Sequence, residues 1–338
     1  MPLSLYVDGP RWRDHLRRTS AASPGLVPVA KGNGYGFTVR RLARRAEWLG
    51  VDAVAVGTYA EVADVERRFS GDIMVLEPWR PFLPDVVYGP RVIHTVGRGG
   101  DLDALGRRTD TPRVVLEALS SLHRHGFAAA DLPAAAAGAR GVRVAGHALH
   151  LPLGNGHVAE VERWLDLAPA SRWYLSHTST AELDQLRSRH AGVELRPRVG
   201  TALWLGDRGA LSARATVLDR HAVARGERVG YRQRRVTRSG TVLVVSGGTA
   251  HGVALEAPTP AESARQRAVT LAKGGLDAAG RALSPYVVDG RQRWFVEPPH
   301  MQVSLVFVPA SATPPAVGDE LDVRMRMTTT HFDHVEIS

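Results

Sequence analysis

Lysine is almost absent from this sequence, yet one lysine stands at the end of a short apolar segment. Of the 43 Lys and Arg residues in the 338-residue chain, only Lys31 and Lys273 are lysines. Lys31 belongs to the stretch "VPVAKGNGYG", residues 27–36, in which three of the five residues after the lysine are glycine. A primary amine can form a Schiff base with a carbonyl compound, whereas a guanidinium cannot. A lysine here, in a chain that otherwise uses arginine, indicates amine chemistry.

The elements that must position Lys31 come from a segment that alternates short apolar runs with helical patterns. Eight runs predict strands, and eight alternating β and α units are typical of a (β/α)8 barrel, followed here by a second domain. The first connection is the clearest, since we expect a helix that begins after Thr38 as N-cap and ends at Gly50. The predicted strands are 26–30, 51–57, 72–77, 92–96, 113–119, 143–151, 171–177 and 194–200.

Polar side chains stand at the predicted C-terminal ends of five of these strands. In barrels of this kind the catalytic groups lie at that end, so we expect these side chains to converge on one face. Glu117 is expected to form an ion pair either with Arg124 or with another cation, and His177 is expected to be structural, as is His147. The whole set is Lys31, Glu117, Arg124, His150, His177, Ser179, Arg198 and Gly200.

After about residue 210 the sequence changes to alternating β-branched residues with turn residues between the runs, which predicts a mostly β second domain. We place the barrel domain at 9–208 and the β-rich domain at 1–8 and 209–338. Residues 260–275 interrupt the pattern, and we expect a short helix or an exposed insertion that holds Lys273 in solvent. The predicted strand runs are 214–223, 240–248, 293–298, 301–309 and 320–327.

Composition restricts the classes of function. The chain has no cysteine, which excludes disulfides and thiolate chemistry. Its net charge is +9, but the arginines are spread over the chain without interleaved aromatic residues, so we predict a solvated basic surface and no nucleic-acid binding. The first twenty residues are charged throughout, and no later apolar run approaches the ~18 residues of a membrane span. We therefore predict a cytoplasmic protein that does not associate with membranes.

Four segments, in order along nearly the whole chain, resemble motifs of the alanine racemase family. "VAKGNGYG" resembles the family's K-A-N-A-Y-G signature, and "GHALHLP" resembles the strand of the active-site histidine. "RPRVGTALWLG" resembles R-x-G-I-x-x-Y-G, and "ARGERVGY" resembles P-G-E-x-V-S-Y-G. Members of this family are fold-type III amino-acid racemases that depend on pyridoxal 5′-phosphate (PLP). The resemblance implies the same cofactor, an amino-acid substrate and a head-to-tail homodimer with shared active sites.

The resemblance also implies a role for each matched residue. Lys31 would hold PLP covalently and act as one base, and Tyr231, from the other subunit, would act as the second base. Tyr35 would contact the phosphate, and His150 would support Tyr231 while being held by Arg198. Arg198 would face the pyridine nitrogen. Because an arginine can only donate there, the nitrogen stays unprotonated, which favours racemisation over decarboxylation.

Further positions follow from the same resemblance. "EALSSLHRHG" resembles K-M-D-T-G-M-G-R-L-G, which implies that Arg124 orients the phenolic oxygen of the cofactor and the substrate carboxylate. Glu117 then replaces a lysine that is often carbamylated, and supplies its negative charge permanently. Met301 would approach the substrate from the partner subunit. The expected phosphate contacts are Tyr35, Ser179 or Thr180, and the backbone amides of Gly200 and Thr201.

The sequence also departs from the family. Thr249, in "GGTAHG", stands where the family has a tyrosine, and no counterpart of the family's C-terminal tyrosine is found before Ser338. A wider pocket and a larger substrate than alanine are therefore expected. His331 and Asp333 have the H-x-D spacing of the metal pair in the related D-threonine aldolases and D-serine dehydratases, although a tail of solvated polar residues is the favoured interpretation. The alternatives are thus a metal-assisted PLP lyase or a non-catalytic PLP-binding regulator.

Overall fold

The computed structural model describes residues 2–255 and 282–338, and the chain divides into two compact units. One unit is Arg13–Gly206, and the other combines Met1–Trp12 with Asp207–Ser338. The predicted helix or insertion at 260–275, with Lys273, lies outside the described residues. In the ranges that are described, no helix has the length and apolar character needed to cross a membrane.

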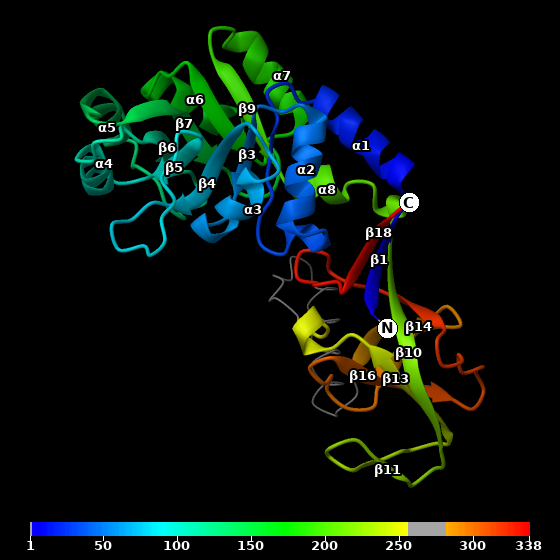
Figure 1. Ribbon diagram of the computed structural model, residues 1–338. Coiled ribbons are helices and arrows are strands. Elements are labelled where there is room, and N and C mark those ends of the chain that lie inside the picture. Colours follow the sequence, from blue (N-terminus) through cyan, green and yellow to red (C-terminus); the bar gives the residue numbers. More distant parts are fainter. Residues whose placement is uncertain (1, 256–281) are drawn as a thin grey trace. The chain divides into compact units, whose positions relative to one another are not determined.

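The first unit contains the eight predicted parallel strands. They lie in the order β2-β9-β8-β7-β6-β5-β4-β3, and a parallel bridge between Val29 and Ala55 joins the two ends of this sheet. The sheet is therefore closed, and the helices lie outside it (Figure 1), which confirms the predicted TIM-type (β/α)8 barrel. The strands are β2 Val27–Pro28, β3 Ala53–Val56, β4 Asp72–Pro78, β5 Val92–Val96, β6 Arg113–Ala118, β7 Arg143–His150, β8 Arg172–Ser176 and β9 Glu194–Val199.

The helices follow the predicted alternation with one exception. Residues 79–91, all of which are described, connect β4 to β5 without a helix. Pro81, Pro84 and Pro90 explain this, since each proline removes a backbone donor and clashes with a preceding helical turn. The helices are α1 Gly9–Ala21, α2 Val39–Leu49, α3 Val62–Glu66, α4 Gly99–Gly106, α5 Leu132–Gly138, α6 Val158–Leu167, α7 Thr180–Arg189 and α8 Thr201–Leu205.

Helix α2 begins and ends where the sequence predicts, but its N-cap differs. Gly50 ends the helix in the left-handed conformation, with φ of 69°. Thr38 makes no capping hydrogen bond through its side chain. Its φ of 77° is far from the extended backbone from which an N-cap hydroxyl reaches the first turn, so the prediction of a Thr38 cap was wrong.

The barrel interior sets the direction of the functional side chains. A buried cluster lies in the barrel interior, and it includes Val115 of β6, Ala148 of β7 and Tyr174 of β8. Side chains two positions apart on a strand point to the same side of the sheet. Glu117, His150 and Ser176, each two positions further along these strands, therefore face the interior at the C-terminal end.

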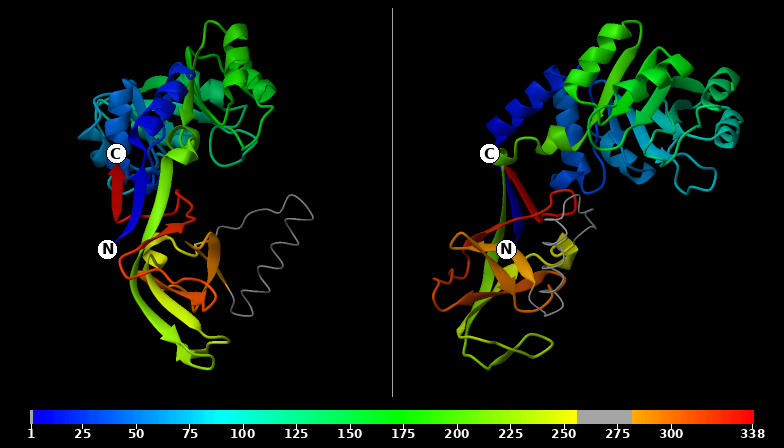
Figure 2. Two further views of the ribbon diagram at one scale, coloured as in Figure 1. Left: turned by 90° about the vertical axis from the view of Figure 1, so that its right-hand side faces the viewer. Right: turned by 180° about the vertical axis from the view of Figure 1, so that it is seen from behind.

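The second unit is built almost entirely of antiparallel strands, which confirms the predicted β-rich domain. Its main sheet has the order β13-β16-β15-β14-β17-β10-β1-β18, and an additional β13–β10 pairing joins six of these strands into a closed ring. The 13-residue strand β10 is the long yellow-green strand in Figure 2. The strands are β1 Leu3–Val7, β10 Leu211–Val223, β11 Arg228–Val229, β12 Arg234–Arg235, β13 Gly240–Ser246, β14 Leu283–Val288, β15 Arg291–Phe295, β16 Val303–Pro309, β17 Glu320–Val323 and β18 His334–Ile337.

The C-terminal residues form part of this sheet. Strand β18 pairs in parallel with β1, and Val335 is buried. One carboxylate oxygen of Asp333 accepts a hydrogen bond from the Leu3 amide at 2.9 Å, and the other lies 3.1 Å from His251 Nε2. The polar residues His334 and Glu336 are exposed as expected, but the segment is an edge strand and not a free tail, because the short alternation in "HVEI" buries Val335.

Candidate active site

Three inward-facing residues lie side by side at the C-terminal end of the barrel. The register of β7, β8 and β9 pairs His150 with Ser176 and Ser176 with Arg198. Arg198 Nε donates a hydrogen bond of 2.9 Å to Ser176 Oγ, and both residues are buried. The predicted strand-end residues of β7 and β9 therefore converge, with Ser176 between them.

A buried ion pair occupies the centre of this end of the barrel. Arg198 Nη1 lies 3.3 Å from Glu117 Oε2, and only 3% and 1% of these residues are exposed. Arg198 Nη2 and Glu117 Oε1 are also buried and have no hydrogen-bond partner among the described residues. Because buried polar atoms are nearly always satisfied, these two atoms indicate a place for a polar ligand. Of the two partners expected for Glu117, the structure selects a cation other than Arg124.

His150 lies among positive charges. Burial lowers the pKa of His150 to about 2, and the nearby charges of Arg198, Arg124 and Lys31 contribute to this. The imidazole is therefore neutral near pH 7. Its ring meets that of His177 edge-on, with centroids 4.9 Å apart. Within the described residues Arg198 makes no hydrogen bond to His150, since its Nε and Nη1 are directed to Ser176 and Glu117.

Lys31 stands at the barrel mouth, directly after the segment that closes the barrel. Desolvation lowers the pKa of its amine, and the positive charges of Arg124 and Arg198 lower it further. Arg124 lies in the loop after β6, and burial also lowers the pKa of this guanidinium. Lys31, Arg124 and Arg198 are therefore three cations near two carboxylates, those of Glu117 and Glu61, and this surplus of positive charge favours an anionic ligand.

Glu61 is a residue of this site that sequence reasoning missed. It ends the short 3-10 turn Tyr59–Glu61 that follows β3. One carboxylate oxygen accepts from the Gly32 amide and the other from the Gly57 amide, both at 2.6 Å. Glu61 thus ties the residue after Lys31 to the end of β3, and its charge raises the pKa of Lys31 against the other influences. The T-x-x-E spacing of Thr58 and Glu61 was the available signal.

Tyr35 and Gly200 are in contact at the same face of the barrel. Tyr35 is buried, and burial together with the charge of Glu61 raises its pKa to about 12, so the phenol stays protonated. A Cβ atom on Gly200 would overlap the Tyr35 hydroxyl, so glycine is required by this close approach. Gly200 precedes Thr201, the first residue of α8. The two predicted phosphate contacts after β2 and β9 are therefore adjacent.

Ser179, which follows β8 and was predicted to bind the phosphate through its hydroxyl, has another role in the structure. Ser179 caps α7, since its hydroxyl donates a 2.8 Å hydrogen bond to Glu182 and accepts from the Glu182 amide. Thr180 is the exposed first residue of the helix. Thr178 Oγ1, by contrast, is buried and has no partner in the described chain. The S-x-x-E capping box could have identified the structural role of Ser179 from the sequence.

The remaining predicted positions belong to the β-rich unit. Tyr231, Thr249 and Met301 line one cavity of about 590 Å³, together with Arg232 and the segment 297–303. Tyr231 and Met301 are strongly exposed. The structure thus brings these three positions together, although they come from three different segments of the chain.

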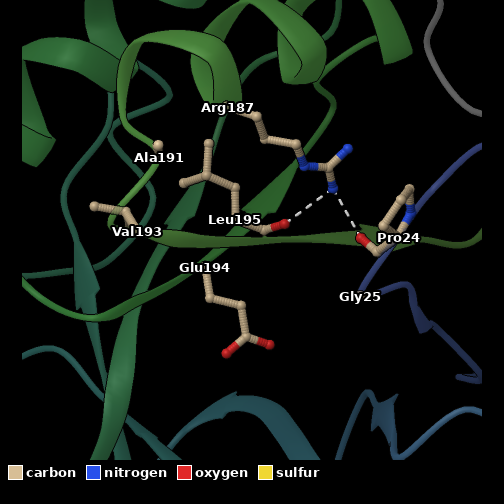
Figure 3. Close-up of a pocket in the computed structure, with 7 residues that line it drawn as sticks. All are labelled: Pro24, Gly25, Arg187, Ala191, Val193, Glu194 and Leu195. Carbon is tan, nitrogen blue, oxygen red and sulfur yellow. Dashed lines mark hydrogen bonds between the residues drawn. The ribbon is translucent and has the colours of Figure 1, made fainter.

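Two other sites contribute nothing to this constellation. A shallow pocket of about 240 Å³ lies at the start of β9, where Arg187 donates to the carbonyls of Pro24 and Leu195 (Figure 3). It is at the opposite end of β9 from Arg198. The H-x-D pair belongs to the lyase alternative: Asp333 of this pair is bonded to Leu3 and His251, and the described residues contain no cluster of three or more side chains that could hold a metal ion.

The fold and the site together define a (β/α)8 protein whose C-terminal mouth combines an amine with a buried ion pair and further cations. Residues 7–190, more than half of the chain, match the family described as "Alanine racemase, N-terminal domain". The chain therefore belongs to the alanine racemase family. No curated protein sequence matches the chain.

Solved structures share the fold over the whole chain. Alanine racemase from Bartonella henselae, with covalently bound pyridoxal phosphate, is 16% identical, with a TM-score of 0.73 over 100% of this chain and 99% of that one. Biosynthetic alanine racemase from Pseudomonas aeruginosa is 23% identical, with a TM-score of 0.67 over 96% and 91%. Histidine racemase from Leuconostoc mesenteroides subsp. sake is 16% identical, with a TM-score of 0.69 over 100% and 98%. At these identities the similarity shows the fold.

Proposed function

We propose that this protein is a PLP-dependent amino-acid racemase, an isomerase that uses two bases at the α-carbon. The observation that carries the proposal is the barrel mouth, where Lys31, with its lowered pKa, shares a face with a buried arginine that has an unsatisfied donor. The barrel of residues 9–208 would bind the cofactor, and the β-rich domain would supply the second base.

The residues of the barrel mouth fit PLP. The surplus of positive charge suits a cofactor that carries a phosphate and a phenolate. Tyr35, with its protonated hydroxyl, and the backbone of Gly200 and Thr201 would hold the phosphate, and Thr178 is a better hydroxyl donor than Ser179 because its oxygen is unoccupied. Arg124 would orient the phenolate and the substrate carboxylate.

Arg198 favours racemisation within this chemistry. PLP supplies an electron sink that acidifies the α-C–H bond of a bound amino acid. The unpartnered Nη2 of Arg198 is a donor that suits the pyridine nitrogen, and an arginine cannot pass a proton to it. With an unprotonated pyridine nitrogen, PLP would withdraw electrons less strongly, which favours rapid return of the proton over slower side reactions. Glu117 holds Arg198 in place by the 3.3 Å ion pair.

Two bases are needed because inversion removes a proton from one face of the α-carbon and returns one to the other. The lowered pKa of Lys31 increases the fraction of neutral amine, which is the form that accepts a proton. Tyr231 from a second copy of the chain would serve the opposite face in a homodimer. His150, neutral near pH 7, has an acceptor nitrogen for the Tyr231 hydroxyl.

The substrate that we propose is an amino acid larger than alanine. Thr249 lines the cavity of the β-rich unit beside Tyr231, in the position where the family has a tyrosine. A threonine there leaves more room for a substrate side chain.

The direct test is incubation of the protein in deuterated water with a panel of L- and D-amino acids. We expect the purified protein to show the visible absorbance of bound PLP, and at least one amino acid to gain α-deuterium and to lose its optical purity. Bound PLP without α-exchange would favour a non-catalytic carrier, and a requirement for a divalent metal would favour a lyase. A protein without the absorbance would refute the cofactor.

A further inference from the structure

We propose that His300, oriented by Glu297, is a positioning residue that holds the phenol ring of Tyr231 for proton transfer. The inference deepens the proposed function, and it rests on it, since it concerns the base that Tyr231 would supply. The three residues belong to the same compact unit and line the same cavity.

The orientation of Tyr231 needs an explanation, because 85% of this residue is exposed. Within residues 2–255 and 282–338 its hydroxyl makes no hydrogen bond, so the tip of the side chain is free to receive a partner. The body of the side chain is in contact with an aromatic ring, since the centroids of the Tyr231 and His300 rings lie 4.5 Å apart with a 37° tilt. Such a contact favours a defined ring orientation.

His300 is itself fixed by a carboxylate. Its Nε2 lies 2.7 Å from Glu297 Oε1, and Glu297 is 3% exposed. This arrangement directs an N–H of the imidazole to Glu297 and fixes the plane of the ring. Gly230, which precedes Tyr231, has a φ of 75°, and a Cβ atom there would overlap the Glu297 carboxylate. The carboxylate therefore packs beneath both His300 and the backbone that carries Tyr231.

The backbone around His300 is hydrogen-bonded as well. The Thr249 amide donates to the His300 carbonyl at 2.8 Å, and the Ala250 amide donates to the Met301 carbonyl at 3.0 Å. The His300 amide donates to the Val303 carbonyl at 2.9 Å, at the start of β16. His300 is thus anchored through its backbone and its side chain, whereas Tyr231 depends on His300.

A catalytic group transfers a proton efficiently only when it is held close to the reacting atom, and a displacement of about 1 Å can lower the rate by about 100-fold. A ring that rests on an anchored neighbour satisfies this requirement while its hydroxyl stays accessible. In this arrangement His300 neither gives nor takes a proton. The proton passes between the Tyr231 oxygen and the α-carbon, and His300 fixes the position of that oxygen.

The test compares His300→Leu with His221→Leu, which removes a histidine from an exposed pair in the same unit, His221 Nε2 to Asp219 Oδ2 at 3.4 Å. We expect His300→Leu to lower kcat by about 10- to 100-fold with a smaller change in KM, and His221→Leu to leave both unchanged. Glu297→Gln keeps a hydrogen-bonding group of the same size, so its loss should be smaller than that of His300→Leu.

A kinetic isotope effect separates positioning from general damage. With α-deuterated substrates, His300→Leu should increase the isotope effect for the enantiomer that Tyr231 deprotonates and decrease it for the enantiomer that Lys31 deprotonates. Equal changes in both directions would overturn the proposal, as would an unchanged kcat. A spectroscopic readout is independent of turnover: with 13C-labelled tyrosine, the ring resonance that is lost in Tyr231→Phe should shift in His300→Leu and not in His221→Leu.

The outcomes distinguish this inference from the function on which it rests. Full racemisation by Tyr231→Phe would remove the second base and the proposed mechanism. Loss of racemisation in Tyr231→Phe, with His300→Leu behaving as His221→Leu does, would leave the mechanism and overturn only the role of His300.

Discussion

The barrel mouth and the cavity of the β-rich unit hold their functional groups by different means. At the barrel mouth, Glu117, Ser176 and Arg198 are strand residues whose direction is set by the alternation of the sheet, and they are buried. In the cavity, Tyr231 and His300 come from irregular segments: their rings are in contact, and His300 is held by the Glu297 carboxylate and by backbone hydrogen bonds. The first site depends on electrostatics inside a rigid frame, and the second on the fixation of an exposed ring.

The largest expected effect is at the barrel mouth. Lys31→Ala should lower racemisation by roughly 1,000-fold or more, because it removes both the cofactor attachment and one base. The visible absorbance of bound PLP should disappear at the same time. Lys31→Arg is the matched control, since it keeps the positive charge and lacks a primary amine. Activity in either variant would contradict the assignment.

Tyr231→Phe tests the other region, with an expected loss of about 100- to 10,000-fold in racemisation. One base should remain, so the enantiomer that Lys31 deprotonates should still exchange its α-proton in deuterated water without inversion. Chiral chromatography combined with mass spectrometry measures both quantities. Exchange that is lost equally for the two enantiomers would show that Tyr231 has no role specific to one face.

Arg198→Leu tests whether the barrel mouth depends on charge balance. It leaves the Glu117 carboxylate buried and uncompensated, which should lower the free energy of unfolding by about 3–5 kcal/mol. The double variant with Glu117→Gln should regain a large part of this loss, because no buried charge is then left unpaired. Urea denaturation of the four proteins gives the coupling directly. Strictly additive losses would mean that the pair does not act as a unit.

The smallest effect concerns the capped helix α7 beside the site. Burial of Glu182 would raise its pKa, but hydrogen bonds from Ser179, His157 and Gly156 outweigh this and hold the pKa at about 2. A carboxyl whose pKa is depressed in the folded state contributes stability that is present above its ordinary pKa and is lost as the pH falls toward 2. The melting temperature should therefore fall on acidification below about pH 5, and Glu182→Gln should reduce this dependence. An unchanged acid profile would contradict the depressed pKa.

The sequence predicts the frame of the barrel well and its connections less well. The eight strands follow from apolar runs of the right length, and the inward direction of Glu117 and His150 follows from period-two alternation. The absence of a helix between β4 and β5 depends on Pro81, Pro84 and Pro90, which interrupt the alternation of strands and helices. The C-terminal strand depends on pairing with β1, which lies more than 300 residues away along the chain. A short polar strand is stabilised by pairing with a distant strand, and its own sequence pattern gives little indication that it is a strand.

The candidate site residues also differ in how much sequence signal they carry. Lys31 could be identified because lysine is rare in this chain, and Arg198 because it ends a predicted strand in a segment that resembles a family motif. Glu61 carries a sequence signal only for its capping role, in the T-x-x-E spacing with Thr58, and the ring contact between His300 and Tyr231 leaves no pattern in residue type. Ser179 was assigned to the phosphate although its spacing to Glu182 predicts a cap, so two interpretations of one serine competed, and the structure uses the hydroxyl for the helix.

The closure of the barrel has a consequence for Lys31. Strand β2 contains only two residues, and the barrel closes beside it through the bridge between Val29 and Ala55 and the hydrogen bond from the Ala30 amide to the Ala55 carbonyl. Glu61 joins the same two edges one step further along. Lys31 therefore lies directly beside the closure of the barrel. Local unfolding at this closure would open the barrel and displace the Lys31 amine at the same time. We therefore expect the stability of the barrel and the position of this amine to be lost together.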